Sequence, residues 1–116
     1  MSQLLIVEDD IVTLFIYEEW FDNNSDVFIA KNVSEALRFL DSNPSISHIL
    51  SDFNLDDQSA VELFSAIKDI SKYKLALALG SDLKEEHKLS LNVFKVEQYF
   101  KKPIDLDAIN QWLEQK

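Results

Sequence analysis

Short apolar runs alternate along the chain with stretches in which apolar residues recur at helical spacing. The runs predict five buried strands, at Gln3–Val7 and at residues 26–30, 48–51, 75–79 and 96–101. The helical spacing predicts helices over residues 11–21, 34–41 and 59–70, a short helix after residue 82, and a last helix after residue 105. Strands that are apolar on both faces and alternate with helices are typical of parallel sheets covered on both sides. We therefore expect an α/β fold with a five-stranded, doubly wound parallel sheet.

Helix starts are marked by polar residues of the types that cap helices. The predicted N-caps are Ser34, Ser59, Asp82 and Asp105. Ser59 and Asp82 are each followed three residues later by a glutamate, which is the spacing of a capping box.

Length and composition narrow the class of protein. A chain of 116 residues without linkers or repeats predicts one domain over residues 1–116, with no effector domain. No apolar run approaches the ~18 residues of a membrane span, and no signal peptide begins the chain, so we expect a cytoplasmic protein. The absence of cysteine and the single Gly80 exclude thiol chemistry, disulfides and glycine-rich phosphate loops. The two histidines, His48 and His87, stand alone and are expected at the surface.

The charge is strongly acidic and unevenly distributed. The net charge is −10, which argues against direct nucleic-acid binding. Residues 1–60 alone carry a net charge of −10, whereas residues 61–116 are neutral overall. An acidic half is either solvated surface or a cation site, and the positions of the acids decide between these.

Several acids and one lysine follow predicted strands directly. Glu8, Asp9 and Asp10 follow the first strand, Asp52 follows the third, and Lys102 follows the fifth. Because a doubly wound sheet binds ligands at the carboxyl ends of its strands, these residues are expected on one rim. Clustered carboxylates repel one another unless a cation lies among them, and all-oxygen ligands favour Mg²⁺ or Mn²⁺.

Three motifs resemble those of the receiver domains of two-component response regulators. They read LIVEDD from Leu5, SDFNL from Ser51 and YFKKP from Tyr99. The resemblance covers the whole chain, with the motifs in the order of the family. It implies the flavodoxin-like (βα)5 receiver fold.

The resemblance implies a role for each matching residue. Asp52 matches the phosphoacceptor, Asp9 the direct Mg²⁺ ligand, and Glu8 the acid that holds the ion through water. Asn54 matches the residue whose backbone carbonyl completes the metal shell, and Lys102 the lysine that contacts the phosphoryl group. The bond between Lys102 and the following proline is often cis in this family.

The expected conformational switch is less well matched. Tyr99 matches the aromatic residue that changes rotamer in the family. The accompanying hydroxyl is assigned to Ser81, although an ungapped count from Lys102 puts Gly80 at that position and a one-residue shift puts Leu79 there. Further departures from the family pattern are Asp56 in place of a proline, Ala60 in place of a glycine and His48 in place of an acid.

The implied function is phosphorelay signalling. A histidine kinase or a histidine phosphotransfer protein would phosphorylate Asp52 and so control binding of a downstream target, and the chain would catalyse only its own phosphotransfer and dephosphorylation. The helix over residues 11–21 carries more apolar residues than a core-facing stripe needs, so Leu14 or Phe15 is expected at the surface for docking of the donor.

A second surface is expected to serve the target or a weak dimer of an otherwise monomeric protein. It comprises the helix after residue 82 and the strand over residues 96–101, where lysines gather: Lys84, Lys88, Lys95 and Lys101. Two alternatives stay open at this point. One is a degenerate receiver that binds partners without phosphate, and the other is a flavodoxin-like enzyme or flavin carrier.

Overall fold

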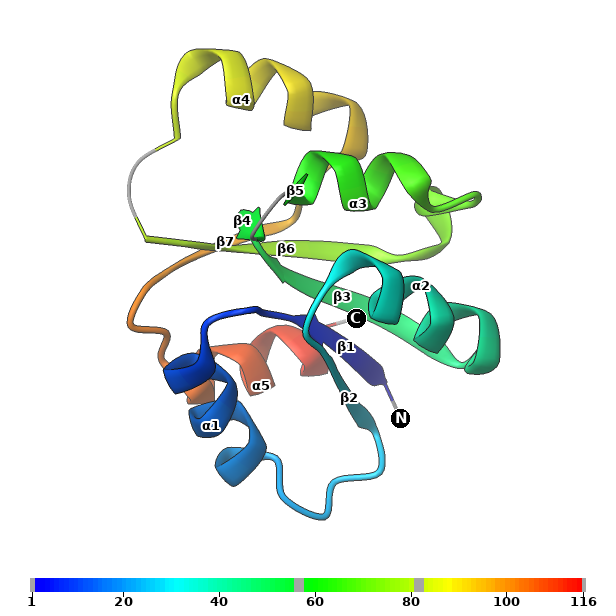
Figure 1. Ribbon diagram of the computed structural model, residues 1–116, viewed down its shortest axis with the longest axis vertical. Helices are drawn as coiled ribbons and strands as arrows, with labels where there is room; N and C mark the ends of the chain where they lie inside the picture. The colour runs from blue at the N-terminus through cyan, green and yellow to red at the C-terminus, as the bar shows by residue number, and fades with distance from the viewer. Residues whose placement is uncertain (1, 56–57, 81–82, 116) are drawn as a thin grey trace.

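A five-stranded sheet lies between two layers of helices in the computed structural model, which describes residues 2–55, 58–80 and 83–115 (Figure 1). The strands are β1 (Gln3–Val7), β2 (Val27–Ala30), β3 (Ile46–Asp52), β6 (Lys74–Leu79) and β7 (Gln98–Lys101). Their order is β2-β1-β3-β6-β7, and every pairing is parallel. The predicted doubly wound parallel sheet is therefore confirmed.

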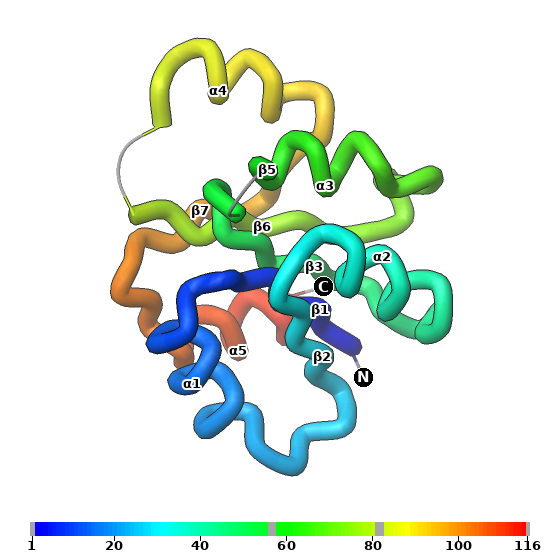
Figure 2. Tube along the Cα trace, in the orientation of Figure 1, coloured from blue at the N-terminus to red at the C-terminus, as the bar shows by residue number. Residues whose placement is uncertain are grey.

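The helices divide between the two faces of the sheet (Figures 1 and 2). One face carries α1 (Ile11–Trp20) and α5 (Leu106–Glu114), and the other carries α2 (Val33–Ser42), α3 (Ala60–Ala66) and α4 (Glu85–Leu91). Two 3₁₀ turns, η1 (Ile70–Lys72) and η2 (Asn92–Phe94), connect to β6 and β7. A two-stranded hairpin, β4 (Asn54–Leu55) and β5 (Gln58–Ser59), joins β3 to α3, and the sequence pattern did not predict it.

The core forms two clusters because the central strands are apolar on both faces. In β1, Leu5 and Val7 belong to the cluster under α2, α3 and α4, whereas Leu4 and Ile6 belong to the cluster under α1 and α5. All four side chains are fully buried, and each contributes about 1.5–3 kcal/mol of transfer free energy. This two-sided burial holds the carboxyl end of β1 rigidly in the middle of the sheet.

The helix caps agree with the prediction in part. Asp105 caps α5 by accepting a hydrogen bond from the Asp107 amide at 3.0 Å, as predicted. The predicted cap Ser34 is wrong, since it lies inside α2, and Asn32 caps the helix by accepting from the Glu35 amide at 2.8 Å. The Glu35 side chain in turn accepts from the Lys31 amide at 3.2 Å, so the helix start is stabilised from both sides.

Two other predicted helices have different bounds. The helix predicted to run to residue 70 ends at Ala66, because the backbone is extended at Ile67. A separate turn follows, in which the Ser71 hydroxyl donates to the Asp69 carboxylate at 3.1 Å. Ser59 is its N-cap residue but makes no side-chain cap bond. The helix predicted from Asp82 begins at Glu85 with Lys84 as its N-cap, and Asp82 itself lies outside the described residues.

His48 is buried, which corrects the expectation of a surface histidine. It lies in β3 beneath α5, where its ring meets Trp112 edge-on at a centroid distance of 4.9 Å. Ser47 Oγ lies 2.7 Å from His48 Nδ1. The preceding residue of the same strand thus supplies a hydroxyl partner for one ring nitrogen, while Nε2 is buried without a hydrogen-bond partner among the described residues. Among the described residues, none of the helices is both apolar enough and long enough to span a membrane.

Candidate functional site

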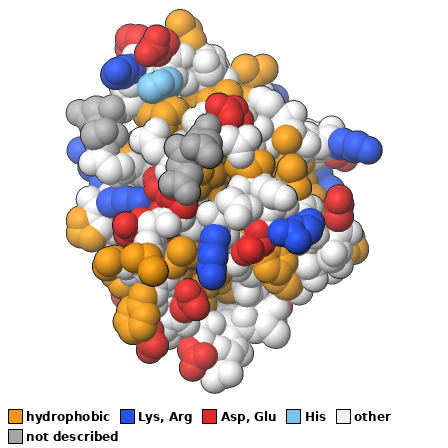
Figure 3. All heavy atoms as spheres, in the orientation of Figure 1, with side chains coloured by type: hydrophobic (Ala, Val, Ile, Leu, Met, Phe, Trp, Pro, Cys, Tyr) orange, Lys and Arg blue, Asp and Glu red, His pale blue; other side chains and the backbone are white. Residues whose placement is uncertain are grey.

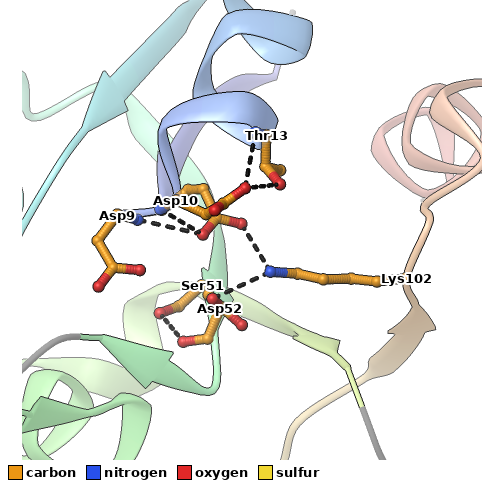
Figure 4. A network of polar contacts seen from close by, with 7 residues as sticks. Asp9, Asp10, Thr13, Ser51, Asp52 and Lys102 are labelled. Carbon is orange, nitrogen blue, oxygen red and sulfur yellow. Dashed lines mark hydrogen bonds and ion pairs between the residues drawn. The ribbon is translucent and has the colours of Figure 1, made fainter.

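The carboxyl ends of three strands bring four charged residues together. Glu8 and Asp9 follow β1, Asp52 is the last residue of β3, and Lys102 follows β7. Since β2 lies on one side of β1 and β3 on the other, the strand order reverses at this point, which is where doubly wound sheets bind ligands. The predicted gathering of these residues on one rim is present (Figure 4).

Glu8 is the most deeply buried charged residue of the cluster. Only 1% of its surface is exposed. Its Oε2 accepts hydrogen bonds from the amides of Asp9 and Asp10, each at 3.1 Å. Its Oε1 lies 3.0 Å from Lys102 Nζ and, among the described residues, accepts no hydrogen bond apart from this ion pair. The turn after β1 therefore fixes one oxygen and leaves the other directed at the centre of the site.

Lys102 connects two of the acids. Its Nζ lies 3.0 Å from Glu8 Oε1 and 3.0 Å from Asp52 Oδ2, and its side chain is 24% exposed. The Lys102 amide donates to the Leu79 carbonyl at 2.9 Å, which fixes the backbone beside β6. The bond from Lys102 to Pro103 is cis. In Figure 4, the Lys102 side chain extends between the carboxylates, whereas Asp9 lies on the far side of the cluster.

The ionisation of the central pair reflects both burial and charge. Burial raises the pKa of Glu8, while Lys102 and the backbone amide of Asp10 oppose that rise. Burial on its own would lower the pKa of Lys102, but Glu8 and Asp52 outweigh it and raise the pKa. Lys102 therefore stays charged at neutral pH and is a permanent cation next to Asp52.

Glu8, Asp9 and Asp52 form a candidate metal site. Each offers one carboxylate oxygen, and these atoms lie within 4.8 Å of one another. The donors are all oxygen, which suits a hard divalent cation. Three carboxylates and one ammonium leave two negative charges unbalanced, so the residues present fit Mg²⁺ or Mn²⁺. Asn54 stands in β4, two residues after Asp52, as the expected source of a carbonyl ligand.

Two neighbouring residues have local roles. Asp10 is the N-cap of α1 and accepts from the Thr13 amide at 3.0 Å and the Thr13 hydroxyl at 2.8 Å, and these bonds lower the pKa of Asp10. Ser51 is buried and donates to the Asp52 carbonyl at 2.8 Å. Sequence reasoning left Asp10 without a separate role, although its position before an apolar run followed by Thr13 is the pattern of an N-cap.

Of the expected switch positions that the structure describes, Leu79 and Gly80 lie at the end of β6 and Tyr99 lies within β7. Leu79 is the last residue of β6 and packs at the edge of the core, and Gly80 follows it. Neither offers a hydroxyl, and Ser81 lies outside the described residues. Tyr99 is 49% exposed in β7, and it lines a cavity together with Leu79 and Lys88.

One of the two expected surface residues of α1 is exposed. Leu14 is buried, because α1 turns Leu14 and Tyr17 towards the sheet, so its expected exposure is wrong. Phe15 is 63% exposed, as expected. The exposed apolar surface of α1 is larger than predicted and comprises Ile11, Val12, Phe15, Ile16 and Trp20. Figure 3 shows hydrophobic atoms gathered over this helix with acidic side chains beside them.

Comparison with known proteins gives matches in structure only. No protein-family model matches the chain, and none of the curated proteins matches it. Among solved structures, a response regulator receiver protein from Pseudomonas putida is 18% identical with a TM-score of 0.81, covering 99% of this chain and 97% of its own. A CheY-like receiver domain protein from Methanospirillum hungatei JF-1 is 24% identical with a TM-score of 0.78, covering 98% and 94%.

A third similar structure comes from a signalling complex. It is the co-crystal structure of the Saccharomyces cerevisiae histidine phosphotransfer protein Ypd1 with the receiver domain of the response regulator Ssk1. The match is 20% identical with a TM-score of 0.75 and covers 97% of this chain and 86% of that one. The chain thus has the CheY-like receiver fold over nearly its whole length, as the motif resemblance implied.

Proposed function

We propose that this chain is a phosphoacceptor receiver in a two-component or phosphorelay pathway. The observation that carries the proposal is the ion-paired cluster in which Lys102 Nζ lies 3.0 Å from both Glu8 and Asp52, with Asp9 beside them, on a receiver fold. The phosphoryl donor is the phosphohistidine of a kinase or of a phosphotransfer protein. A cytoplasmic location and the absence of enzymatic action on other molecules are parts of the same proposal.

Asp52 is the nucleophile in this proposal. One of its carboxylate oxygens forms a bond to phosphorus while the bond from phosphorus to the donor imidazole nitrogen breaks, and that nitrogen keeps the electron pair. Lys102 places a positive charge next to the reacting oxygen and reduces repulsion between the carboxylate and the anionic phosphoryl group. In the later hydrolysis, water oxygen bonds to phosphorus as the bond to the Asp52 oxygen breaks, which releases inorganic phosphate and returns the carboxylate.

A divalent cation completes the proposed chemistry. Glu8, Asp9 and Asp52 would hold Mg²⁺ or Mn²⁺, together with the Asn54 carbonyl. When bound, such an ion neutralises charge on the phosphoryl oxygens and helps to orient them. Glu8 is positioned for this role by its two backbone hydrogen bonds before any ion arrives.

The exposed apolar surface of α1 is the proposed docking site for the donor. It begins directly after the acidic loop, so a partner seated on it is close to Asp52. Glu18 and Glu19 are exposed on the same helix, which favours a partner whose apolar patch has a basic rim. We assign target binding or weak dimerisation to the surface of α4 and β7, where Tyr99, Leu89 and Val93 are exposed among lysines.

A degenerate receiver is the second candidate, because neither Leu79 nor Gly80 offers a hydroxyl to a phosphoryl group. Mass spectrometry after incubation with acetyl phosphate and Mg²⁺ separates the two candidates. We expect wild type to gain one phosphate, Asp52→Asn to gain none, and the exposed control Asp41→Asn to behave as wild type. Labelling of Asp52→Asn to the level of wild type would contradict the assignment, and an unlabelled wild type would favour the degenerate receiver.

A further inference from the structure

A cavity of about 220 Å³ lies beside the phosphoacceptor on the α4 side of the sheet. Its walls come from Phe53, which directly follows Asp52, from β4, from the end of β6 and from the start of α4 with the residues before it. The residues that matter here are Phe53, Asn54, Leu79, Gly80, Lys84 and His87. The site described above uses none of the α4 residues.

Two lining residues from α4 can carry positive charge. Lys84 and His87 are three positions apart, and the His87 amide donates to the Lys84 carbonyl at 3.0 Å, so they share one helical turn. The His87 ring lies against Phe53 at a centroid distance of 4.8 Å. Because Phe53 directly follows Asp52, this contact joins α4 to the strand that carries the phosphoacceptor.

The β6 wall of the cavity is open and has no hydroxyl. A Cβ atom added to Gly80 would have no heavy atom within 4 Å outside its chain neighbours, so there is free space over this residue. Leu79 contributes only a hydrocarbon side chain. Among the lining residues described, the groups that can meet an anion are therefore the Asn54 amide, the Lys84 ammonium and the His87 imidazole.

The two glutamates of α4 do not block an anion from reaching Lys84 and His87. Glu85 Oε1 lies 3.8 Å from Lys88 Nζ on the outer surface, and the Glu85 side chain is 86% exposed. Glu86 is exposed as well. A phosphoryl group adds about −1.5 to −2 charges and three acceptor oxygens, which is the kind of ligand that a cationic cavity wall attracts.

We propose that this cavity is an anion subsite in which Lys84 and His87 contact the phosphoryl group on Asp52, a contact that neither Leu79 nor Gly80 can supply. The inference rests on the proposed phosphoacceptor function and adds to it how α4 senses phosphorylation. In the phosphorylated protein, the two side chains are drawn towards Asp52, and α4 moves with them. The surface of α4 thereby changes through contacts made by its own side chains.

Beryllofluoride, a mimic of the phosphoryl group, tests the inference in the presence of Mg²⁺. The half-saturating concentration and the ¹⁹F NMR signals of the bound mimic are measured for wild type, Lys84→Met/His87→Gln, Lys84→Met alone and the control Lys88→Met. Loss of a charged hydrogen bond corresponds to about a tenfold weaker affinity, which is the expected effect in the double variant. We expect Lys84→Met to show part of that loss together with a displaced ¹⁹F signal, and Lys88→Met to match wild type.

A rescue variant tests whether a hydroxyl at position 80 can replace the contacts of the two α4 side chains. Gly80→Ser, which has room for its side chain, is added to Lys84→Met/His87→Gln and is expected to recover part of the affinity. Equal affinities and ¹⁹F spectra for Lys84→Met, the double variant and Lys88→Met would overturn the inference while leaving phosphorylation of Asp52 intact. A wild-type protein that binds no beryllofluoride and takes no label from acetyl phosphate would contradict the proposed function and the inference together.

Discussion

Two helices pack on the same face of the sheet and use their apolar residues in opposite ways. In α5, the large apolar side chains Ile109 and Trp112 point inward and polar residues cover the outside. In α1, only Leu14 and Tyr17 point inward, while five large apolar side chains face outward. The two tryptophans of the chain show the contrast, since Trp112 is 2% exposed and Trp20 is 47% exposed.

This difference separates a structural helix from one that has a further role. The amphipathic pattern of α5 is explained by folding alone, because its apolar stripe matches the surface that it buries. The outer apolar residues of α1 remain between 47% and 80% exposed, and contiguous patches of this kind mark interaction surfaces. The position of α1 directly after the acidic loop supports the docking role proposed for it.

Replacing each of the two tryptophans separately by alanine is the strongest test of the contrast between α5 and α1. Trp112→Ala deletes a buried ring that packs against His48 and Phe100, and it should lower the free energy of unfolding by about 3–5 kcal/mol. Trp20→Ala deletes an exposed ring and should change that free energy by less than about 1 kcal/mol. Urea denaturation measures both, and equal losses would show that the two helices contribute to the fold in the same way.

Neighbouring residues of α1 give a sharper test. Leu14→Ala should cost about 2–5 kcal/mol of stability because its side chain is buried. Phe15→Ala should change stability by only about 0.5 kcal/mol, yet slow transfer from a phosphotransfer protein about tenfold, as loss of an interface anchor does. Labelling by acetyl phosphate should be unchanged in Phe15→Ala. Equal slowing with both donors would contradict the docking role.

The same contrast explains what the sequence could and could not predict. The strands β1 and β6 were predictable because they are almost continuous apolar runs, whereas β3 contains polar residues and extends from Ile46 to Asp52, beyond the predicted residues 48–51. The convergence of Glu8, Asp52 and Lys102 followed from their places after successive predicted strands. The orientation of α1 was not predictable, because apolar residues occur on all sides of this helix and do not show which side faces the sheet. In α5, the polar residues between Ile109 and Trp112 mark the outer face, so the inward side was clear.

Other features depend on contacts between distant segments. The burial of His48 requires Trp112 to lie over it, and these residues are 64 positions apart in the printed sequence. The cavity beside Phe53 requires α4 to stand over the end of β3. Neither arrangement leaves a local pattern in the chain, so secondary-structure reasoning could not find them.

The start of α1 provides a third test through its two adjacent aspartates. In metal-free buffer, Asp9→Ala should raise the free energy of unfolding by up to about 1 kcal/mol, because it removes one of the clustered like charges. Asp10→Ala should lower it, because the N-cap bonds to Thr13 are lost. Mg²⁺ should stabilise wild type and Asp10→Ala but not Asp9→Ala. Thermal melting with EDTA and with Mg²⁺ measures all of these, and a destabilised Asp9→Ala that binds Mg²⁺ normally would contradict the metal assignment.

The smallest expected effect concerns the interface between β3 and α5. Burial, assisted by the charge of Lys74 and opposed by Glu97, lowers the pKa of His48 below its ordinary value of 6.5. The folded state thus binds a proton less tightly than the unfolded state does, so this stabilisation is complete above pH 6.5 and is lost as pH falls through the lower, folded-state pKa. Because protonation would place a charge against Trp112, α5 should loosen first.

The measurement is the free energy of unfolding from about pH 8 down to about pH 5 for wild type and His48→Gln. The carboxylates titrate in both proteins, so the informative quantity is the difference between the variant and wild type. We expect that difference to shrink towards acid pH, since the variant has no imidazole at this position to protonate. Amide exchange should quicken in α5 of wild type at the acid end of the range, and not in α1. A constant difference for His48→Gln would mean that this histidine keeps the same proton affinity in the folded and unfolded chains.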